Sequence, residues 1–394
     1  MNILFRAAGF LTLAAGAVLP VAAEVLPLHV PGRGEGFSPS AGVIASPHGS
    51  LYGVVENSSK GPHYNLVRGC GLVFRINAKG MYKTLLDFND LKYSEGCRVA
   101  GELLLDNGYL YGLTYDVGPD RHGTLFRLSR SGGHELIHAF NGTDGSLPVG
   151  GLSRGADGKL YGVTQEGGQH GAGTVFRVDR SGQLETLHHF QDNTPLGADT
   201  IRPLVLGPDG AMYGTSLTNV VGKGAVYRVT TAGTIELVRS LSTAEGCYPS
   251  GLSLGRDGWL YGAAMLCGQH GFGTLYRVHP DGRLQTLHHF NGEDGSGPRD
   301  RPTQGPDGAW YGTTIGYLEG SAGTLYRFQP GAAEAMEVLH RFNLAVEDGI
   351  DPVGPVLPGA DGSLYGTTRT GGNTKGPLGT GPGMVYRFPP AQKQ

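Results

Sequence analysis

Apolar and polar positions follow one repeating pattern along most of the chain. A turn containing Asp-Gly or a close variant precedes Leu-Tyr-Gly, and a Gly-rich loop then leads to an apolar-aromatic-Arg segment. The tripeptide or a close variant occurs seven times, and its spacing of roughly 50 residues is within the range of propeller blades. The central tyrosines are Tyr52, Tyr111, Tyr161, Tyr213, Tyr261, Tyr311 and Tyr365.

The third copy of this repeat unit shows the strands that each unit predicts. Asp157-Gly158 is a strong hairpin signal because both residues tolerate positive φ. The expected strands are residues 151–153, 160–162, 173–178 and 184–190, with a second turn at 180–182.

Such a unit is too small to bury its own faces, so neighbouring units must stack around an axis. We therefore predict an all-β fold, a seven-bladed β-propeller with four antiparallel strands per blade. The strand-four pattern follows strand three only six times. The segment Glu24 to Val30 resembles it, so we expect this N-terminal strand to close the ring, with Pro27 at an outer edge.

The first 23 residues predict a secretory signal peptide. Arg6 precedes an apolar run from Ala7 to Val18, and Val21-Ala22-Ala23 supplies small residues for cleavage. An uncleaved anchor is the alternative, although the run is short for a membrane span. We expect residues 24–394 to form a single domain, secreted or periplasmic in a bacterium, with no membrane span after cleavage.

Charged residues make up only 16% of the chain and the net charge is −3, which argues against nucleic-acid binding. Gly-x-Ser-x-Gly occurs at residues 151–155 and 251–255, and His-Glu-x-x-His occurs at residues 134–138. Each falls in an expected strand of the repeat, not in the strand–turn–helix or the helix that these catalytic motifs require. We expect no cofactor, no metal and a monomer.

The residues Leu160 to Gly168, followed by Gly171 to Phe176, resemble the GloVer-type tandem repeat of secreted bacterial proteins. The resemblance covers nearly all of the chain after the predicted signal peptide. It implies an extracellular, propeller-like protein.

Four cysteines allow three pairings. In a propeller, the loop between strands two and three lies on the same face as the loop that enters the next blade. Cys70 and Cys97 fall in such neighbouring loops, as do Cys247 and Cys267. We expect these two disulfides, which export permits. A metal site, the alternative, lacks Cys-x-x-Cys spacing.

Residues that recur in every unit are expected to be structural. The strand-three arginines predict hydrogen bonds between blades, and the repeated tyrosines predict packing. The recurrent strand-four histidines are His138, His188, His288 and His340. Asp144-Gly145-Ser146 and Asp294-Gly295-Ser296 predict turns, with Ca²⁺ binding as the alternative.

Departures from the repeat gather in the long loops of units seven, one and two, which should be neighbours on one face. The candidate catalytic residues there are His122, Tyr115, Arg121, His63 and Tyr64. The candidate substrate-binding residues are Arg68, Tyr93, Lys92, Arg98 and Arg369. Further residues expected on this face are Arg202, Arg299, Arg301, Tyr248, His170 and His270.

These residue types predict an extracellular partner, an acidic (uronate) polysaccharide that is bound and, in the stronger hypothesis, cleaved by β-elimination. Arginine forks suit carboxylates, and tyrosine offers a stacking surface for sugar rings. Elimination needs a group that neutralises the carboxylate, a base and an acid. Propeller-fold polysaccharide lyases, including ulvan lyases, are similar in fold and residue type.

Other readings remain open. A glycoside hydrolase would need two carboxylates, for which Asp116, Asp120, Glu56 and Glu95 are available. A lyase acting on a small cyclic molecule would need a His–Glu–metal pocket. The main alternative is a non-catalytic binding or scaffold protein, because a propeller does not determine its function.

Overall fold

The computed structural model describes residues 24–32, 37–57, 69–316, 322–332, 334–343, 348–372 and 381–390. The predicted signal peptide lies outside them. These residues form 29 strands and two short 3-10 helices, η1 (Phe88–Asp90) and η2 (Tyr93–Glu95), and include no α-helix. In this part of the chain, no helix is long and apolar enough to span a membrane.

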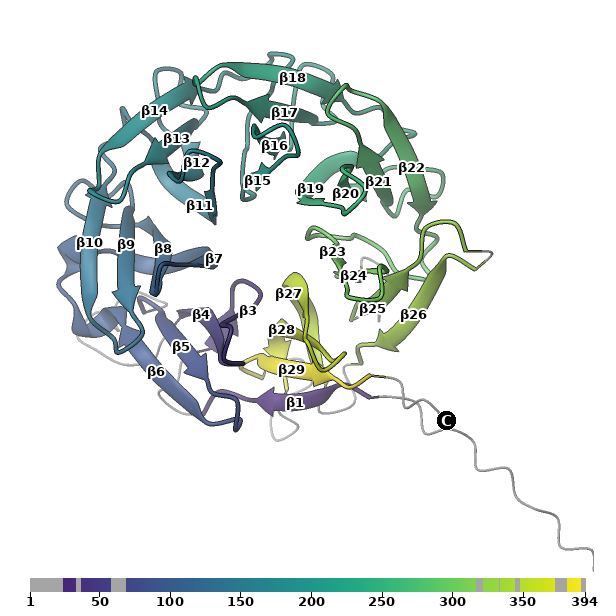
Figure 1. Ribbon diagram of the computed structural model, residues 1–394, viewed down its shortest axis with the longest axis horizontal. Helices are drawn as coiled ribbons and strands as arrows, with labels where there is room; N and C mark the ends of the chain where they lie inside the picture. Colours follow the sequence, from purple (N-terminus) through teal and green to yellow (C-terminus); the bar gives the residue numbers. More distant parts are fainter. Residues whose placement is uncertain are drawn as a thin grey trace, which may run out of the picture.

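The strands form separate sheets that follow one another around a central axis (Figure 1). Three sheets have four consecutive strands each. They are β15 (Val205–Leu206), β16 (Met212–Ser216), β17 (Ala225–Val229) and β18 (Ile235–Ser240); β19 (Cys247–Leu254), β20 (Leu260–Leu266), β21 (Thr274–Val278) and β22 (Leu284–His289); and β23 (Thr303–Gln304), β24 (Trp310–Thr314), β25 (Thr324–Phe328) and β26 (Met336–Arg341).

A larger sheet of eight strands consists of two four-stranded halves. The halves are β7 (Cys97–Asp106), β8 (Tyr109–Asp116), β9 (Thr124–Ser129) and β10 (His134–Ala139), and β11 (Ser146–Arg154), β12 (Leu160–Glu166), β13 (Thr174–Val178) and β14 (Leu184–His189). Because β7 and β11 meet at a single parallel pair, Glu102 with Gly151, each half keeps the antiparallel order of a repeat unit.

The N-terminal strand pairs with the last strand of the chain, as predicted. In β1, Leu26 lies opposite Arg387 and Pro27 opposite Tyr386. This strand is the outer edge of a sheet with β29 (Met384–Phe388), β28 (Leu364–Gly371) and β27 (Gly349–Pro358), where β1 spans Leu26–His29. The remaining sheet contains β2 (Phe37–Pro39), β3 (Ile44–Ala45), β4 (Leu51–Asn57), β5 (Leu72–Ile76) and β6 (Tyr82–Asp87).

In units three to seven, the tyrosine of the repeated tripeptide ties the hairpin turn to the second strand. Tyr161 is fully buried, and its hydroxyl donates a hydrogen bond of 2.9 Å to Asp157 Oδ2 in the turn. A Cβ on Gly162 would lie 2.4 Å from the ring of Phe176 on the next strand, so this position must stay small. The tyrosines therefore pack within the units, as predicted.

The strand-three arginines correct one expectation. Most of them bind carboxylates of their own sheet, as Arg228 does with Glu236 at 2.7 Å, rather than groups of a neighbouring sheet. Arg177 makes both kinds of contact, because it binds Glu185 at 2.8 Å and also donates to the carbonyl of Thr231 in the next sheet. The carboxylates lie on the adjacent strand in some units, as Glu185 does, and in the hairpin turn in others, as Asp361 does for Arg387.

The strand-four histidines are structural, as expected. His138 Nε2 lies 2.8 Å from Asp144 Oδ2, and Asp144 Oδ1 accepts a hydrogen bond from the Asn141 amide. His288 repeats this contact with Asp294 at 2.7 Å. These carboxylates hold their own turns, and no group of three or more potential metal ligands occurs in the described segments.

Both predicted disulfides are confirmed. Cys70 bonds to Cys97 and joins the loop before β5 to the start of β7, and Cys247 bonds to Cys267 within the unit of β19 and β20. Both bonds fit an oxidising compartment outside the cytoplasm.

Candidate functional site

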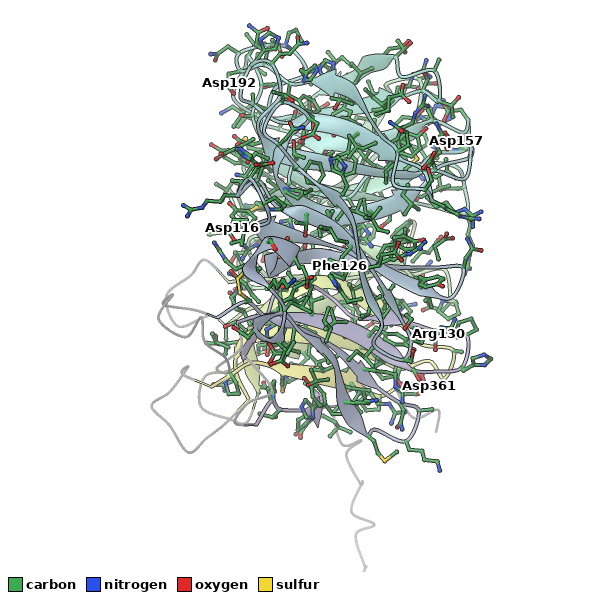
Figure 2. The ribbon with its side chains drawn as sticks, turned by 90° about the vertical axis from the view of Figure 1, so that its left-hand side faces the viewer. Asp116, Phe126, Arg130, Asp157, Asp192 and Asp361 are labelled. Atoms are coloured by element: carbon green, nitrogen blue, oxygen red, sulfur yellow. A yellow bond between two sulfur atoms is a disulfide. The ribbon has the colours of Figure 1, made fainter. Side chains whose placement is uncertain are left out.

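The molecule has two unlike faces (Figure 2). Asp116 and Asp192 lie on one side, whereas Asp157, Arg130 and Asp361, all in short hairpin turns, lie on the other. We call these sides the loop face and the hairpin face. The sequence predicted this alternation.

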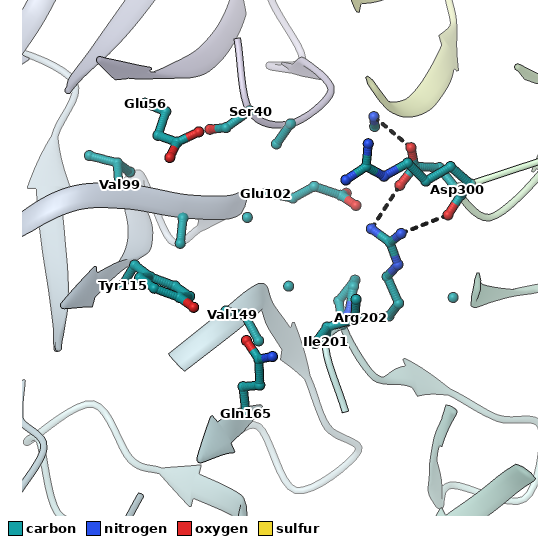
Figure 3. Close-up of a pocket in the computed structure, with 18 of the residues that line it drawn as sticks. Ser40, Glu56, Val99, Glu102, Tyr115, Val149, Gln165, Ile201, Arg202 and Asp300 are labelled. Atoms are coloured by element: carbon teal, nitrogen blue, oxygen red, sulfur yellow. Dashed lines mark hydrogen bonds and ion pairs between the residues drawn. The ribbon is translucent and has the colours of Figure 1, made fainter. Parts of the chain in front are cut away.

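An axial cavity of about 300 Å³ lies towards the loop face. First strands of the units, or the segments before them, supply most of its wall, and second strands supply Glu56, Tyr115, Gln165 and Arg369. Figure 3 shows Glu56, Tyr115 and Gln165 directed into this space. Every sheet around the axis contributes a segment to the wall, so the cavity forms only when all of these sheets are assembled.

Two charged residues occupy positions on the axis where the other units carry Gly or Pro. In each unit, one residue of the first strand lies opposite the repeated tyrosine. The residue two positions before it is, in units one to seven, Gly42, Glu102, Gly151, Pro203, Gly251, Arg301 and Pro355. At Gly42 and Gly151 the backbones touch, because a Cβ there would lie 2.7 Å from the carbonyl oxygen of Pro355 and 2.6 Å from that of Glu102. Glu102 and Arg301 fill the space that remains.

These two residues form a two-pronged ion pair. Arg301 Nη2 lies 2.7 Å from Glu102 Oε2, and Nη1 contacts Oε1. The Coulomb attraction of Glu102 and its hydrogen bonds raise the pKa of Arg301 against the effect of burial, the largest single influence, which lowers it. The pair therefore stays charged and fixed.

A second ion pair joins Arg202 and Asp300, the residues just before the axial positions Pro203 and Arg301. Arg202 Nη1 binds Asp300 Oδ1 at 3.1 Å, and its Nη2 donates to the carbonyl of Arg299 at 2.8 Å. Asp300 Oδ2 also accepts a hydrogen bond of 2.8 Å from the amide of Gly354 (Figure 3). Asp300 thus holds two other units together at the axis.

A second cavity, of about 430 Å³, lies on the hairpin side of these pairs. Its wall includes Leu104, Ser153 and Val205, which follow the axial positions along their strands. Both cavities are lined by Glu102, Pro203 and Arg301. The Glu102–Arg301 pair therefore lies between the two cavities, and we call it the floor of the axial cavity.

One wall carries an arginine whose charge is already balanced. Arg98 binds Asp116 at 3.0 Å and Glu56 at 3.2 Å, and its guanidinium lies 4.9 Å from the ring centre of Tyr115. Burial raises the pKa of Tyr115, with Arg98 opposing it, so the Tyr115 hydroxyl keeps its proton at neutral pH.

The opposite wall carries two arginines that share one carboxylate. Arg299 Nη1 lies 3.9 Å from Asp351 Oδ1, and Arg369 Nε lies 3.6 Å from Asp351 Oδ2, both longer than hydrogen bonds. The arginine side chains are 33% and 35% exposed. Among the described residues, Arg369 Nε has no hydrogen-bond partner. This arginine pair keeps an excess positive charge at the cavity wall.

Only some predicted site residues come together. Tyr115, Arg98 and Arg369 line the axial cavity. Lys92 and Arg121 are exposed and do not line it, and His122 Nδ1 lies 2.9 Å from Ser146 Oγ, away from the cavity wall. His63, Tyr64, Arg68 and the side chain of Tyr93 lie outside the described part of the molecule.

Sequence reasoning missed Glu102 and Asp300, and it placed Arg202, Arg299 and Arg301 on the correct face without grouping them. A usable signal existed. Glu102 and Arg301 replace Gly or Pro at one position of the repeat, so a comparison of the units position by position would have marked them.

The sequence pattern of the Gloeobacter/Verrucomicrobia repeat matches residues 20–219 and 200–394. The chain belongs to this repeat family. The matches span nearly all of the repeat units, in agreement with the predicted GloVer-type repeat. No curated protein matches this member of the Gloeobacter/Verrucomicrobia repeat family.

Solved structures share the fold of this repeat protein. A streptogramin B lyase structure superposes with a TM-score of 0.61 at 15% identity, over 93% of this chain and 97% of the other. The extracellular domain of a candidate hybrid two-component system from B. thetaiotaomicron gives a TM-score of 0.57 at 15% identity, over 90% of this chain and 39% of the other. At such low identity these likenesses concern the fold alone.

Proposed function

We propose that the chain is an exported seven-bladed β-propeller, with its ring closed by β1. Seven units can be counted when the eight-stranded sheet is divided at its single bridge between β7 and β11: six have four strands, and the first has five because both β2 and β3 pair with β4. The pairing of β1 with β29 supports closure, because it joins the two ends of the described chain in one sheet. The disulfides and the predicted signal peptide support export.

We further propose that the axial cavity binds the carboxylate of an acidic saccharide. The arrangement of Arg299 and Arg369 around one shared carboxylate, Asp351, carries this proposal. Two guanidinium groups facing a single negative charge leave donors and charge for a ligand, and arginine forks match the planar geometry of a carboxylate. Arg98, Arg202 and Arg301 are already paired, so they define the walls and floor.

The rest of the wall suits a sugar ring. Tyr115 offers an aromatic surface with a protonated hydroxyl, and Gln165 and Ser40 add neutral polar groups to the cavity wall. A volume of about 300 Å³ is at the lower end of the range of about 300–1,000 Å³ for small-molecule pockets. The cavity therefore fits one or two sugar residues.

Calorimetric titration with a galacturonate disaccharide, and with the same disaccharide after reduction of its carboxylates to alcohols, tests this function. We expect binding of the acid only. Arg369→Gln and Arg299→Gln should each weaken binding about tenfold or more, because a hydrogen bond to a charged group contributes about 1.5–3 kcal/mol. Arg283→Gln, in an exposed turn of the hairpin face, is the matched control. Equal affinity for the acid and the alcohol would contradict the proposal.

Cleavage by β-elimination is a second candidate, favoured by one observation. The Tyr115 hydroxyl faces the cavity and keeps its proton, so it could give that proton to the leaving oxygen of a uronate whose carboxylate is held by the arginine pair. The Glu56 carboxylate, which lines the same cavity, would be the base that takes the ring proton. Absorbance of the unsaturated uronate product tests this candidate. A rise that Tyr115→Phe abolishes without weakening binding would establish it, whereas a flat trace with intact binding favours a binding protein.

A further inference from the structure

A two-pronged ion pair lies at the far end of the axial cavity, and this restricts what can enter. Its floor is the Glu102–Arg301 pair, with both prongs formed. The Arg202–Asp300 pair lies beside it, and Asp300 is itself anchored to the Gly354 amide. Side chains that bind each other and the backbone in this way do not leave the axis without losing charged hydrogen bonds.

Backbone contacts also close three of the junctions between neighbouring units. A Cβ on Gly101 would lie 2.5 Å from the main chain of Gly150, and a Cβ on Gly150 would lie 2.7 Å from the main chain of Arg202. Gly354 likewise meets the backbone of Gly42. A saccharide chain therefore cannot leave through these three junctions.

We infer that the site recognises the end of an acidic saccharide chain and not an internal stretch. This inference rests on the proposed function. A pocket that is open only towards the loop face admits a terminal residue and the one before it, while the rest of the chain extends into solvent. An internal segment would need a second opening, and the Glu102–Arg301 pair occupies the axis where such an opening would lie.

Arg299 and Arg369 then act as the positioning pair for the terminal or penultimate uronate. Both line the cavity wall. Their shared partner Asp351 lies in β27 and itself has a left-handed backbone conformation, with φ of 54°. The ligand class is accordingly a uronate-terminated oligosaccharide, with mono- and disaccharide fragments as sufficient ligands.

A length series tests the inference. Calorimetry with galacturonate, its disaccharide, its tetrasaccharide and the long polymer should give affinities per chain that level off at the disaccharide, within about threefold. The stoichiometry should stay fixed per chain at every length. A number of bound proteins that grows with polymer length, together with disaccharide binding more than about tenfold weaker than polymer binding, would overturn chain-end recognition.

Failure of the inference is distinguishable from failure of the proposed function. If the polymer binds in proportion to its length and Arg369→Gln weakens that binding, the acidic-saccharide function stands and chain-end recognition falls. If no member of the series binds, the proposed function itself fails, and chain-end recognition fails with it.

Glu102→Gly/Arg301→Gly, which restores the residue type found in other units at these positions, removes the floor. A cooperative unfolding transition shows that this variant is folded. Its affinity should then continue to rise for saccharides longer than the disaccharide. An affinity that depends on saccharide length as in the wild type would also overturn the inference.

Discussion

Arg301 and Glu102 lie 199 positions apart in the chain and form a two-pronged ion pair on the axis. In five other units the equivalent position holds Gly or Pro. The pair occupies space that the repeat otherwise leaves clear, and it joins two units that are not neighbours along the chain.

Removing one partner of this pair should destabilise the protein. Arg301→Gln leaves the half-buried Glu102 carboxylate without its cation, and we expect a loss of about 1–3 kcal/mol in the free energy of unfolding. Urea unfolding measures it. The double variant Glu102→Gln/Arg301→Gln should lose less than the sum of the two single variants, and additive losses would show that the two groups do not interact.

Tyr276 offers a stabilising substitution. Its hydroxyl is fully buried and has no hydrogen-bond partner among the described residues, and units one to three carry Phe74, Phe126 and Phe176 instead. Tyr276→Phe should raise the free energy of unfolding by about 1 kcal/mol, because an unsatisfied buried hydroxyl is removed.

Tyr261 is the matched control for Tyr276. Its hydroxyl donates to Asp257 Oδ2 at 2.9 Å, so Tyr261→Phe should lower stability by about 0.5–1.5 kcal/mol. Thermal unfolding of both variants checks the contrast. A loss of stability in Tyr276→Phe equal to that in Tyr261→Phe would contradict the assignment of an unpaired hydroxyl.

The disulfide in the fifth unit should stabilise its sheet measurably. Cys247 and Cys267 are separated by 20 residues, and closing a loop of this length contributes about 3 kcal/mol in the chain-entropy view. Cys247→Ala/Cys267→Ala should lose up to about that amount in urea unfolding. Mass spectrometry after alkylation should label the wild-type cysteines only after reduction, and labelling without reductant would show that the bonds are absent.

The turn that contains Asp144 should make the free energy of unfolding smaller as the pH is lowered. Burial by itself raises the pKa of Asp144, but hydrogen bonds from His138 and the Asn141 amide outweigh it and hold the pKa below its usual value. A carboxylate whose pKa is lower in the folded than in the unfolded protein stabilises the fold at pH values above its unfolded pKa, about 3.9. That contribution is lost as the pH falls through the folded value.

Urea unfolding across a pH series from neutral to acid checks this turn. Wild type should lose stability more steeply than Asp144→Asn below the unfolded pKa, since the variant has no carboxylate to protonate there. Parallel curves for the two proteins would show that Asp144 makes no linked contribution.

Local signals were sufficient to predict most of the fold. Asp157-Gly158 with Leu160-Tyr161-Gly162 specifies a hairpin within a few residues, and the similarity of residues 24–30 to strand four predicted their place beside β29. Loop order alone put each cysteine beside its partner.

The site was harder to predict because it depends on contacts across the axis. His122 was predicted from its chemistry, but its ring contacts Ser146 on a neighbouring strand and does not line the axial cavity. Arg98 was chosen as a ligand contact, yet Glu56 and Asp116 balance its charge. No spacing in the sequence indicates that Arg299 and Arg369, which are 70 positions apart, share Asp351.

Arginine modification followed residue by residue tests the central claim most directly. Phenylglyoxal should react with the partly exposed Arg299 and Arg369, and peptide mass spectrometry should show both protected by saturating galacturonate disaccharide, whereas Arg283 on the hairpin face reacts equally with and without it. Equal modification of Arg299 and Arg369 in the presence and absence of the disaccharide would contradict an acidic-saccharide site in the axial cavity.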